Sequence, residues 1–383
     1  ARSKEDEAYK EQAMHATYLV QHGHRGYQAI LQHILNVSVT DLKRNYANLN
    51  VEFDLWKGES DAQPYIPDMV QKMKDDGFAY ISDGALVVDV KEDTDTKEIP
   101  PCMILKSDGA SLYNTTDLAT IVWREEDYDP DEIIYVVDKR QELHFVQVFR
   151  CARKTGLVKP ETELKFLGFG TMNGKDGKPF KTRDGGVMRL EYLVSEIDNE
   201  MLKKITENQK SKENLGISEE EAKETAKTVA LAAIKYGDLS NQASKDYIFD
   251  IDRFTSFEGN TGPYILYTIV RIKSILHKYH DLGKNADNSV ITAAHSESEK
   301  NLMLELSKFN AVIEGAFTDT APHKICSYIY DLANAFNSFY HETKIMSEED
   351  ETVQKSYIRL LELTKSVLET SIDLLGFSAP ERM

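Results

Sequence analysis

The chain has 383 residues, of which 41% are hydrophobic and 29% are charged, and its formal net charge is -18. This length is enough for two or three domains with sizeable cores. No apolar run reaches the about 18 residues of a membrane span and no basic-then-apolar leader is visible, so we expect neither a membrane protein nor a secreted one. The acidic balance argues against indiscriminate nucleic-acid binding and against DNA as a partner, but it leaves room for a specific RNA.

The first half of the sequence alternates between helical and extended patterns. Apolar positions recur at helical spacing through residues 1–50. The predicted strands are 51–56, 85–90, 103–106, 133–138 and 164–170, and the predicted helices are 68–78, 111–124 and 141–157. Such alternation predicts a parallel α/β sheet, with ligand sites at the carboxyl ends of its strands.

From about Leu190 onward the strand signals vanish and amphipathic helices dominate. The helix predicted over 218–237 has Ser218 as its N-cap, with acidic residues in its first turn. The broad apolar stripes of 324–343 and 356–376 are typical of a helical bundle.

The three cysteines, Cys102, Cys151 and Cys326, are far apart and lack C-x-x-C spacing. This excludes a zinc knuckle, and we expect no bound metal. Scattered thiols of this kind are typical of a reducing compartment, so we predict a cytoplasmic protein in which the three are buried as small hydrophobic groups.

A basic, glycine-rich stretch, GFGTMNGKDGKPFKTRDGGVMRL, runs from Gly168 to Leu190. Its glycines and its proline oppose a regular helix and favour a loop. A cationic loop in an acidic protein indicates a site for an anion, most commonly phosphate, although a solvated hairpin is the alternative.

The segment KPFKTRDGG in this stretch resembles the degenerate Lys-Met-Ser-Lys-Ser loop of arginyl-tRNA synthetases. Further blocks resemble the same family in the same order: VEFDLWKGES, SDGALVVDV, KSDGASLYNTTDLA, IIYVVDKRQELHF, GDLSNQASKDYIFD, FEGNTGPYILY and the terminal APERM. Together these blocks extend through nearly all of the chain.

The resemblance implies a class I aminoacyl-tRNA synthetase that joins arginine to its tRNA, with ATP as a substrate that Mg²⁺ accompanies. It also implies an incomplete Rossmann-like catalytic domain in residues 1–195, a helical connector contacting the tRNA stem in 196–249, and an all-helical anticodon-binding domain in 250–383. We expect a monomer whose partners are arginine, ATP and arginine tRNA.

The resemblance assigns the substrate arginine to Tyr113, Asp117 and Gln141. A guanidinium needs a carboxylate that accepts two hydrogen bonds and an aromatic group nearby, and Asp117 and Tyr113 are of these types. The alternative is structural, because Asn114-x-x-Asp117 also resembles a helix N-cap followed by an acid in the first turn.

For ATP, the resemblance assigns Lys178 and Lys181 to the phosphates as catalytic contacts, with Lys175 as a spare. Adenylate formation depends on positioning and charge neutralisation, which lysines closing over the phosphates supply. His144 resembles a residue on the nucleotide side of the site, although a structural histidine is the alternative. Glu59 faces the same region in the family, and we assign it no role.

For the tRNA, the resemblance places Tyr264, Tyr267 and Met383 where the anticodon loop docks. Aromatic side chains read single-stranded RNA by stacking on unpaired bases. The alternative for each tyrosine is a place in the core of the bundle.

One departure from the family bears on mechanism. Class I synthetases carry a His-Ile-Gly-His-type motif after their first strand, and the only similar string here, at His22, Gly23 and His24, follows no predicted strand. We therefore expect a C-terminal portion that lacks the N-terminal extension and the first part of the catalytic fold, and that is inactive alone. The alternative is a non-catalytic paralogue or fragment that binds tRNA or a protein partner.

Overall fold

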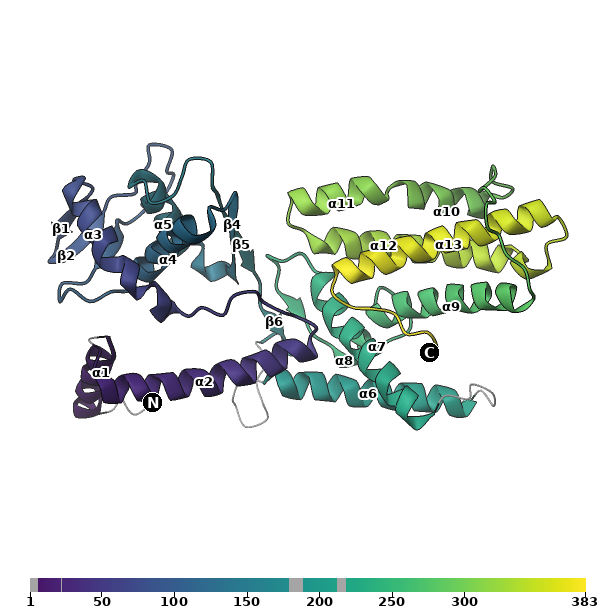
Figure 1. Cartoon of the computed structure of the whole chain (residues 1–383), viewed down its shortest axis with the longest axis horizontal. Coiled ribbons are helices and arrows are strands. Elements are labelled where there is room, and N and C mark those ends of the chain that lie inside the picture. The colour runs from purple at the N-terminus through teal and green to yellow at the C-terminus, as the bar shows by residue number, and fades with distance from the viewer. Residues whose placement is uncertain (1–5, 22, 179–188, 212–217) are drawn as a thin grey trace.

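The computed structural model describes residues 6–21, 23–178, 189–211 and 218–383. Figure 1 shows an α/β part and a helical bundle that stand side by side, with the first two helices running beneath the α/β part toward α6. Each part is built around its own hydrophobic core.

The α/β part contains two small sheets. Its elements are α1 (Glu7–Gln21), α2 (Arg25–Asn48), η2 (Glu59–Tyr65), α3 (Ile66–Asp75), β1 (Ala79–Ser82), β2 (Ala85–Val88), β3 (Cys102–Leu105), α4 (Tyr113–Tyr128), β4 (Glu132–Asp138), η3 (Lys139–Gln141), α5 (Glu142–Lys154), β5 (Glu163–Phe169) and β6 (Met172–Asn173). Strands β4 and β5 are parallel and in register from Glu132↔Glu163 to Asp138↔Phe169.

The helical part begins at α6. Its elements are α6 (Leu190–Ser211), α7 (Glu219–Leu239), β7 (Tyr247–Ile248), α8 (Ile251–Phe254), α9 (Gly262–Asp281), α10 (Glu297–Ser307), α11 (Phe309–Thr318), α12 (Pro322–Glu342), η4 (Ile345–Ser347) and α13 (Glu351–Leu374). The predicted N-cap of α7 is confirmed, because Ser218 Oγ accepts a hydrogen bond from Glu221 N at 3.1 Å.

The predicted sheet needs a correction, because two of its expected strands lie elsewhere. Strands β2 and β3 belong to an antiparallel sheet of order β1-β2-β3, and of the five expected strands only those at β4 and β5 pair in parallel within the described residues. The turn Asp83-Gly84, with φ of 49° and 81°, joins β1 to β2. An Asp-Gly pair with both φ angles positive is the connection of a tight β-hairpin, which forces antiparallel pairing.

The strand predicted over 51–56 is wrong. The segment has no regular structure, and its aromatic side chains pack on the end of α2 instead. Tyr46 lies 5.1 Å from Phe53 and 5.8 Å from Trp56 between ring centroids, and Lys43 lies over the Trp56 ring. Ring contacts in this small, partly exposed aromatic cluster take the place of strand pairing.

The histidine-containing string near the start lies between two helices. Helix α1 ends at Gln21 and α2 begins at Arg25, while Gly23 has a φ of 74° and His22 is outside the described residues. A left-handed glycine of this kind ends a helix. The preceding element that the structure describes is therefore a helix and not a strand.

The two cores differ in size but both are well buried. In the α/β part, Ile104, Leu118 and Val148 have no exposed surface, and neither do Cys102 and Cys151. Cys326 is equally buried in the bundle, so the prediction of three buried free thiols is confirmed. Among the helices of the described ranges, none combines the length and apolar character needed to cross a bilayer.

The two parts are joined where the strands of the α/β part end. Lys139 Nζ lies 2.8 Å from Asp246 Oδ1, and the same oxygen accepts a hydrogen bond from Thr171 N at 2.8 Å. Strand β6, which follows β5, pairs in parallel with β7 of the connector, Met172↔Tyr247. The first residues of the basic stretch therefore pack on the connector to the helical part.

Candidate functional site

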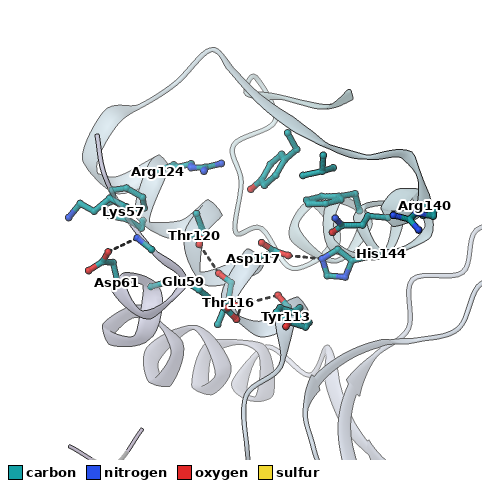
Figure 2. A pocket seen from close by; sticks show the side chains of 17 residues that line it. Lys57, Glu59, Asp61, Tyr113, Thr116, Asp117, Thr120, Arg124, Arg140 and His144 are labelled. Atoms are coloured by element: carbon teal, nitrogen blue, oxygen red, sulfur yellow. Dashed lines mark hydrogen bonds and ion pairs between the residues drawn. The ribbon is translucent and has the colours of Figure 1, made fainter. Parts of the chain in front are cut away.

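A cavity of about 620 Å³ opens at the carboxyl end of β4. Figure 2 shows that its walls come from η2 and the turn before it, from one face of α4, and from β4 and the start of α5. Tyr113, Asp117, Thr120 and Arg124 all line it from α4. Their spacing of four, three and four residues places them in one row along that helix.

The start of α4 is held by threonine and not by Asn114 or Asp117. Thr115 Oγ1 accepts a hydrogen bond from Leu112 N at 3.0 Å and donates one to Ile104 O at 2.5 Å. Asn114 Nδ2 instead donates to Cys102 Sγ at 3.3 Å. The capping alternative for Asn114 and Asp117 is therefore wrong, and the Asp117 carboxylate is left for the cavity.

The central contact of the cavity is a hydrogen bond between two of the predicted site residues. His144 Nε2, on α5, lies 2.6 Å from Asp117 Oδ2, on α4, and Figure 2 shows the two side chains pointing toward each other. The His144 ring is also packed edge-on against Phe145, with ring centroids 4.9 Å apart. These two contacts fix the orientation of the carboxylate.

The other two residues predicted to contact arginine lie on the same cavity. Tyr113 is the first residue of α4 and is 71% exposed. Gln141 ends η3, and its side-chain amide makes no hydrogen bond with any described residue. Sequence positions 113, 117, 141 and 144 therefore converge on one cavity, with Asp117 and His144 already paired.

The cavity also contains residues to which the sequence analysis assigned no role. Glu59 Oε1 accepts a hydrogen bond from Thr116 Oγ1 at 3.0 Å, which anchors the wall formed by η2. Lys57 lies over the Trp123 ring, and the Arg124 guanidinium lies over the Tyr135 ring. The spacing of four, three and four residues from Tyr113 to Arg124 is the sequence signal that could have identified Arg124 as a cavity residue.

Arg140 also lines the cavity, but its charge is already matched. Its guanidinium binds Asp138 with distances of 2.9 Å from Nε to Oδ1 and 2.6 Å from Nη2 to Oδ2. The side-chain hydrogen bond from Arg140, followed by a backbone one, lowers the pKa of Asp138 to about 2. The pair closes the carboxyl end of β4.

Of the predicted phosphate-binding lysines, Lys175 and Lys178 do not line this cavity. Lys181 lies outside the described residues, and Lys178 is exposed. Lys175 Nζ pairs with Asp250 Oδ1 at 3.1 Å and with Asp252 Oδ2 at 3.3 Å. The hydrogen bond to Asp250 is the main cause that raises the pKa of Lys175.

The tyrosines predicted to contact the anticodon lie on α9, facing α12. Tyr264 is half-buried, and its hydroxyl donates to Asn334 Oδ1 at 2.7 Å and accepts from Asn337 Nδ2 at 2.9 Å. Tyr267 is half-buried beneath the Arg271 guanidinium, 4.7 Å from its ring centroid. Tyr264 is thus held against α12 by two hydrogen bonds that its sequence position does not predict.

The third predicted anticodon residue, Met383, is partly buried against the bundle core. Lys273 Nζ, which is 7% exposed, holds the chain just before it through Glu381 Oε1 at 2.6 Å and through Glu369 at 3.2 Å. Arg382 pairs with Glu221 of α7 at 2.9 Å. The last residues are therefore fixed against α7 and α9.

Known protein families match the two parts separately. Residues 1–251 match the family model described as tRNA synthetases class I (R), catalytic domain, and residues 265–383 match the DALR anticodon binding domain. These matches confirm the fold class expected from the sequence, an α/β catalytic domain followed by an all-helical anticodon-binding domain.

Solved structures share the fold. Arginyl-tRNA synthetase from Plasmodium falciparum superposes with a TM-score of 0.82 at 24% identity, over 98% of this chain and 62% of that one. The Thermus thermophilus arginyl-tRNA synthetase gives a TM-score of 0.78 at 21% identity, over 95% of this chain and 68% of that one.

Curated relatives are much closer in sequence. The arginine–tRNA ligase of Agathobacter rectalis is 72% identical over all of this chain, and that of Alkaliphilus oremlandii is 58% identical. The chain spans 64% of the length of each of these relatives. Because a family model covers well over half of its residues and both relatives carry the same name, the chain belongs to the arginyl-tRNA synthetase family of class I aminoacyl-tRNA synthetases.

Proposed function

We propose that this chain supplies the arginine-binding and anticodon-binding parts of an arginine–tRNA ligase, which activates arginine with ATP and transfers it to arginine tRNA. The observation that carries this proposal is the Asp117 carboxylate, held in the cavity by His144 at 2.6 Å. A carboxylate whose orientation is fixed before binding loses little conformational entropy when a guanidinium docks on it.

Arginine recognition follows from the chemistry of the cavity wall. The guanidinium of the substrate docks on Asp117, whose charge complements it and whose planar oxygens match its paired N–H groups. Tyr113 at the mouth offers an aromatic face, and the free amide of Gln141 offers both a donor and an acceptor. A neutral or smaller side chain leaves Asp117 unpaired, which makes the site selective for arginine.

ATP is the second substrate, and it enters with Mg²⁺ as part of the nucleotide complex. Lys178 and Lys181 contact its phosphates in this proposal, with Lys175 in reserve and His144 on the nucleotide side. The exposure of Lys178 supports the proposal, because no carboxylate among the described residues pairs with its ammonium group and an exposed lysine is available to a phosphate. Within the described residues no cluster of three His, Cys, Asp or Glu side chains is arranged to hold a metal ion by itself.

The tRNA is the third substrate, and the anticodon loop docks on the helical part at Tyr264, Tyr267 and Met383. Support comes from the partly exposed rings of the two tyrosines on one side of α9 and from the fixed position of the C-terminal residues. Residues 1–195 act as the catalytic portion, 196–249 as the connector and 250–383 as the anticodon-binding portion. Leu193 and Ile197 already pack in the helical core, which supports a boundary near residue 195.

We further propose a monomer that works in the cytoplasm and binds its substrates without completing adenylate formation. Three buried free thiols support a reducing compartment. The described part of the chain contains no strand leading into a His-x-Gly-His string, and that motif supplies part of the ATP site in the family. In this proposal the chain acts as the C-terminal portion of the enzyme, which binds the substrates but does not form the adenylate by itself.

Calorimetric titration of the purified chain with arginine tests the central assignment. Replacing Asp117 with asparagine should weaken arginine binding by about 2–5 kcal/mol, on the order of 30-fold or more, because one partner of a charge-assisted pair is lost. Citrulline, which is neutral but similar in shape, should bind no better than arginine binds to the variant. Equal affinities of wild type and Asp117→Asn for arginine would exclude Asp117 as the guanidinium partner.

A further inference from the structure

One wall of the cavity carries a cation for which the described residues supply no ionic partner. Among the described residues, no carboxylate lies within ion-pair distance of Arg124, and its guanidinium makes no hydrogen bond. The other arginine of the cavity, Arg140, is fully matched by Asp138. An unpaired guanidinium on a cavity wall is a ready-made contact for an anionic group.

The position of this guanidinium is fixed by the protein. Its Cζ atom lies 5.1 Å from the centroid of the Tyr135 ring, and Arg124 itself is half-buried. Tyr135 is 8% exposed and packs on Phe145 at 4.7 Å between ring centroids, so the ring beneath Arg124 is a rigid platform. A cation stacked on an aromatic face keeps its N–H edge available for a ligand.

The tyrosine beneath Arg124 also has an unsatisfied polar group. The Tyr135 hydroxyl is buried and has no hydrogen-bond partner among the described residues. Burial is the main cause that raises the pKa of Tyr135 to about 12, with opposing effects from the charges of Arg124 and Asp117. Buried polar groups without partners are rare in folded proteins and occur at sites that a ligand or ordered water completes.

The spacing of the two charges fits a zwitterionic ligand. Asp117 and Arg124 are seven residues apart on the same face of α4, which corresponds to about 10 Å along the helix axis. This is of the same order as the length of an extended arginine molecule. In Figure 2 both side chains border the same open space, with Thr120 between them. The cavity therefore offers a negative group and a positive group at the two ends of one helix face.

We propose that Arg124 is a substrate-binding residue that holds an anionic group of the ligand while Asp117 holds its guanidinium. The assignment rests on the proposed arginine site, and it adds recognition of the opposite end of the substrate. Two sources supply such an anion: the carboxylate of free arginine and a phosphate of ATP. Lys57, for which the described residues also supply no carboxylate, lies over the Trp123 ring at 5.2 Å. It is exposed, whereas Arg124 is half-buried and has the planar N–H edge that matches a carboxylate or phosphate.

The test titrates the chain with arginine, with argininamide, which lacks the carboxylate, and with magnesium ATP. Wild type should bind arginine about 10-fold or more tightly than argininamide, because a hydrogen-bonded charge pair is lost with the amide. Arg124→Gln should abolish this preference while leaving the affinity for argininamide unchanged. If the anion is instead a phosphate, Arg124→Gln weakens ATP by a similar factor and leaves the arginine-to-argininamide ratio as in wild type.

Three further variants separate this role of Arg124 from effects of net charge and of partial unfolding. Lys74→Gln removes one positive charge from the exposed side of α3, away from the cavity, and controls for net charge. Arg124→Lys keeps the charge but loses the planar fork, so it should retain only part of the preference. Because both ligands are measured on the same protein sample, their ratio is insensitive to a partly unfolded variant. Tyr135→Phe keeps the ring beneath Arg124 but removes the hydroxyl that a ligand completes, so it should weaken arginine and argininamide alike and leave their ratio as in wild type.

The outcomes are distinct. If Arg124→Gln changes neither the arginine-to-argininamide ratio nor the affinity for ATP, the assignment of Arg124 is wrong even where Asp117→Asn abolishes arginine binding. If wild type binds neither arginine nor ATP, both this assignment and the proposed function fail together.

Discussion

The helical part and the α/β part bury their apolar surfaces to different extents. In the bundle, α9, α12 and α13 each bury a full stripe, and Phe336, Phe339 and Tyr279 have almost no exposed surface. In the α/β part, Ile134 and Val136 of β4 are 40% and 60% exposed. Parallel strands normally have both faces covered, so the β4–β5 pair is unusual.

Helix α2 repeats this contrast. It is 24 residues long, and none of its side chains is buried. Ile30, Ile34 and Val37 follow one another at helical spacing and are all more than half exposed. The comparison teaches that the bundle completes its core from its own residues, whereas the α/β part presents apolar surface that its own elements do not cover.

The largest expected effect concerns catalysis. In class I synthetases the ATP site needs the His-x-Gly-His-type motif as well as the lysine loop. We expect the purified chain to show no arginine-dependent exchange of pyrophosphate into ATP above background, even though it binds arginine. The matched measurement is the same assay on an intact arginine–tRNA ligase. Exchange by the chain at the rate of an intact enzyme would show that the α/β part is catalytically sufficient.

Stability of the bundle is the next test of the contrast. Phe336→Ala should lower the free energy of unfolding of the helical part by about 3–5 kcal/mol, because it removes a fully buried ring and leaves a cavity. Phe317→Ala is the matched control, since that ring is 83% exposed on α11. Chemical denaturation followed by circular dichroism measures both free energies of unfolding. Equal losses in the two variants would show that Phe336 does not lie in a tightly packed core.

RNA binding should depend on the bundle alone. Tyr267→Ala should weaken binding of an arginine tRNA anticodon stem-loop to the chain by about 1–3 kcal/mol, the usual cost of losing one stacked base. Tyr264→Phe should have a smaller effect, because it keeps the ring and removes only the hydroxyl bonded to Asn334 and Asn337.

Phe317→Ala, an exposed aromatic outside this cluster, serves as the binding control. The salt dependence should be shallower than that of a basic protein, because few phosphates are neutralised. Unchanged binding by folded Tyr267→Ala would place this tyrosine in a purely structural role.

The smallest expected effect is at the contact that joins the two parts. The hydrogen bond from Lys139, followed by one from Thr171 N, lowers the pKa of Asp246 to about 2. An aspartate has a pKa of about 3.9 when unfolded, so this group stabilises the fold above about pH 4 and loses that contribution as the pH falls toward 2. Asp246→Asn and Lys139→Met should both flatten the acid dependence of the unfolding midpoint over that interval. An unchanged slope in both variants would show that the contact contributes no stability.

Periodicity predicted most helices because each buries one stripe of its own sequence. The predicted helices around α4, α5, α12 and α13 all form, and Ser218 caps α7 as expected. Strand pairing was harder, because it depends on turns and neighbours. The Asp83-Gly84 pair carries a hairpin signal, and in the fold this local turn outweighs the alternation with helices.

Prediction of the site has the same limit, because contacts between elements do not follow from the pattern within one element. Spacing within one helix places Tyr113 and Asp117 together, and His144 is also predicted at the site. Its hydrogen bond to Asp117 joins two elements and is seen only in the structure. Tyr135 reads in the sequence as one more apolar position of a core strand. Its unpartnered hydroxyl and the guanidinium above it become visible only when β4 is placed against α4.

The parallel pairing of β6 with β7 has a practical consequence for dissecting this protein. A helical fragment that starts at residue 190 retains β7 but loses β6, and it thereby leaves the edge of β7 and the carboxylate of Asp246 without Thr171 N. An exposed strand edge is a template for association with other chains. A fragment that starts at residue 171 keeps these backbone contacts and is the better choice for studying the helical part by itself.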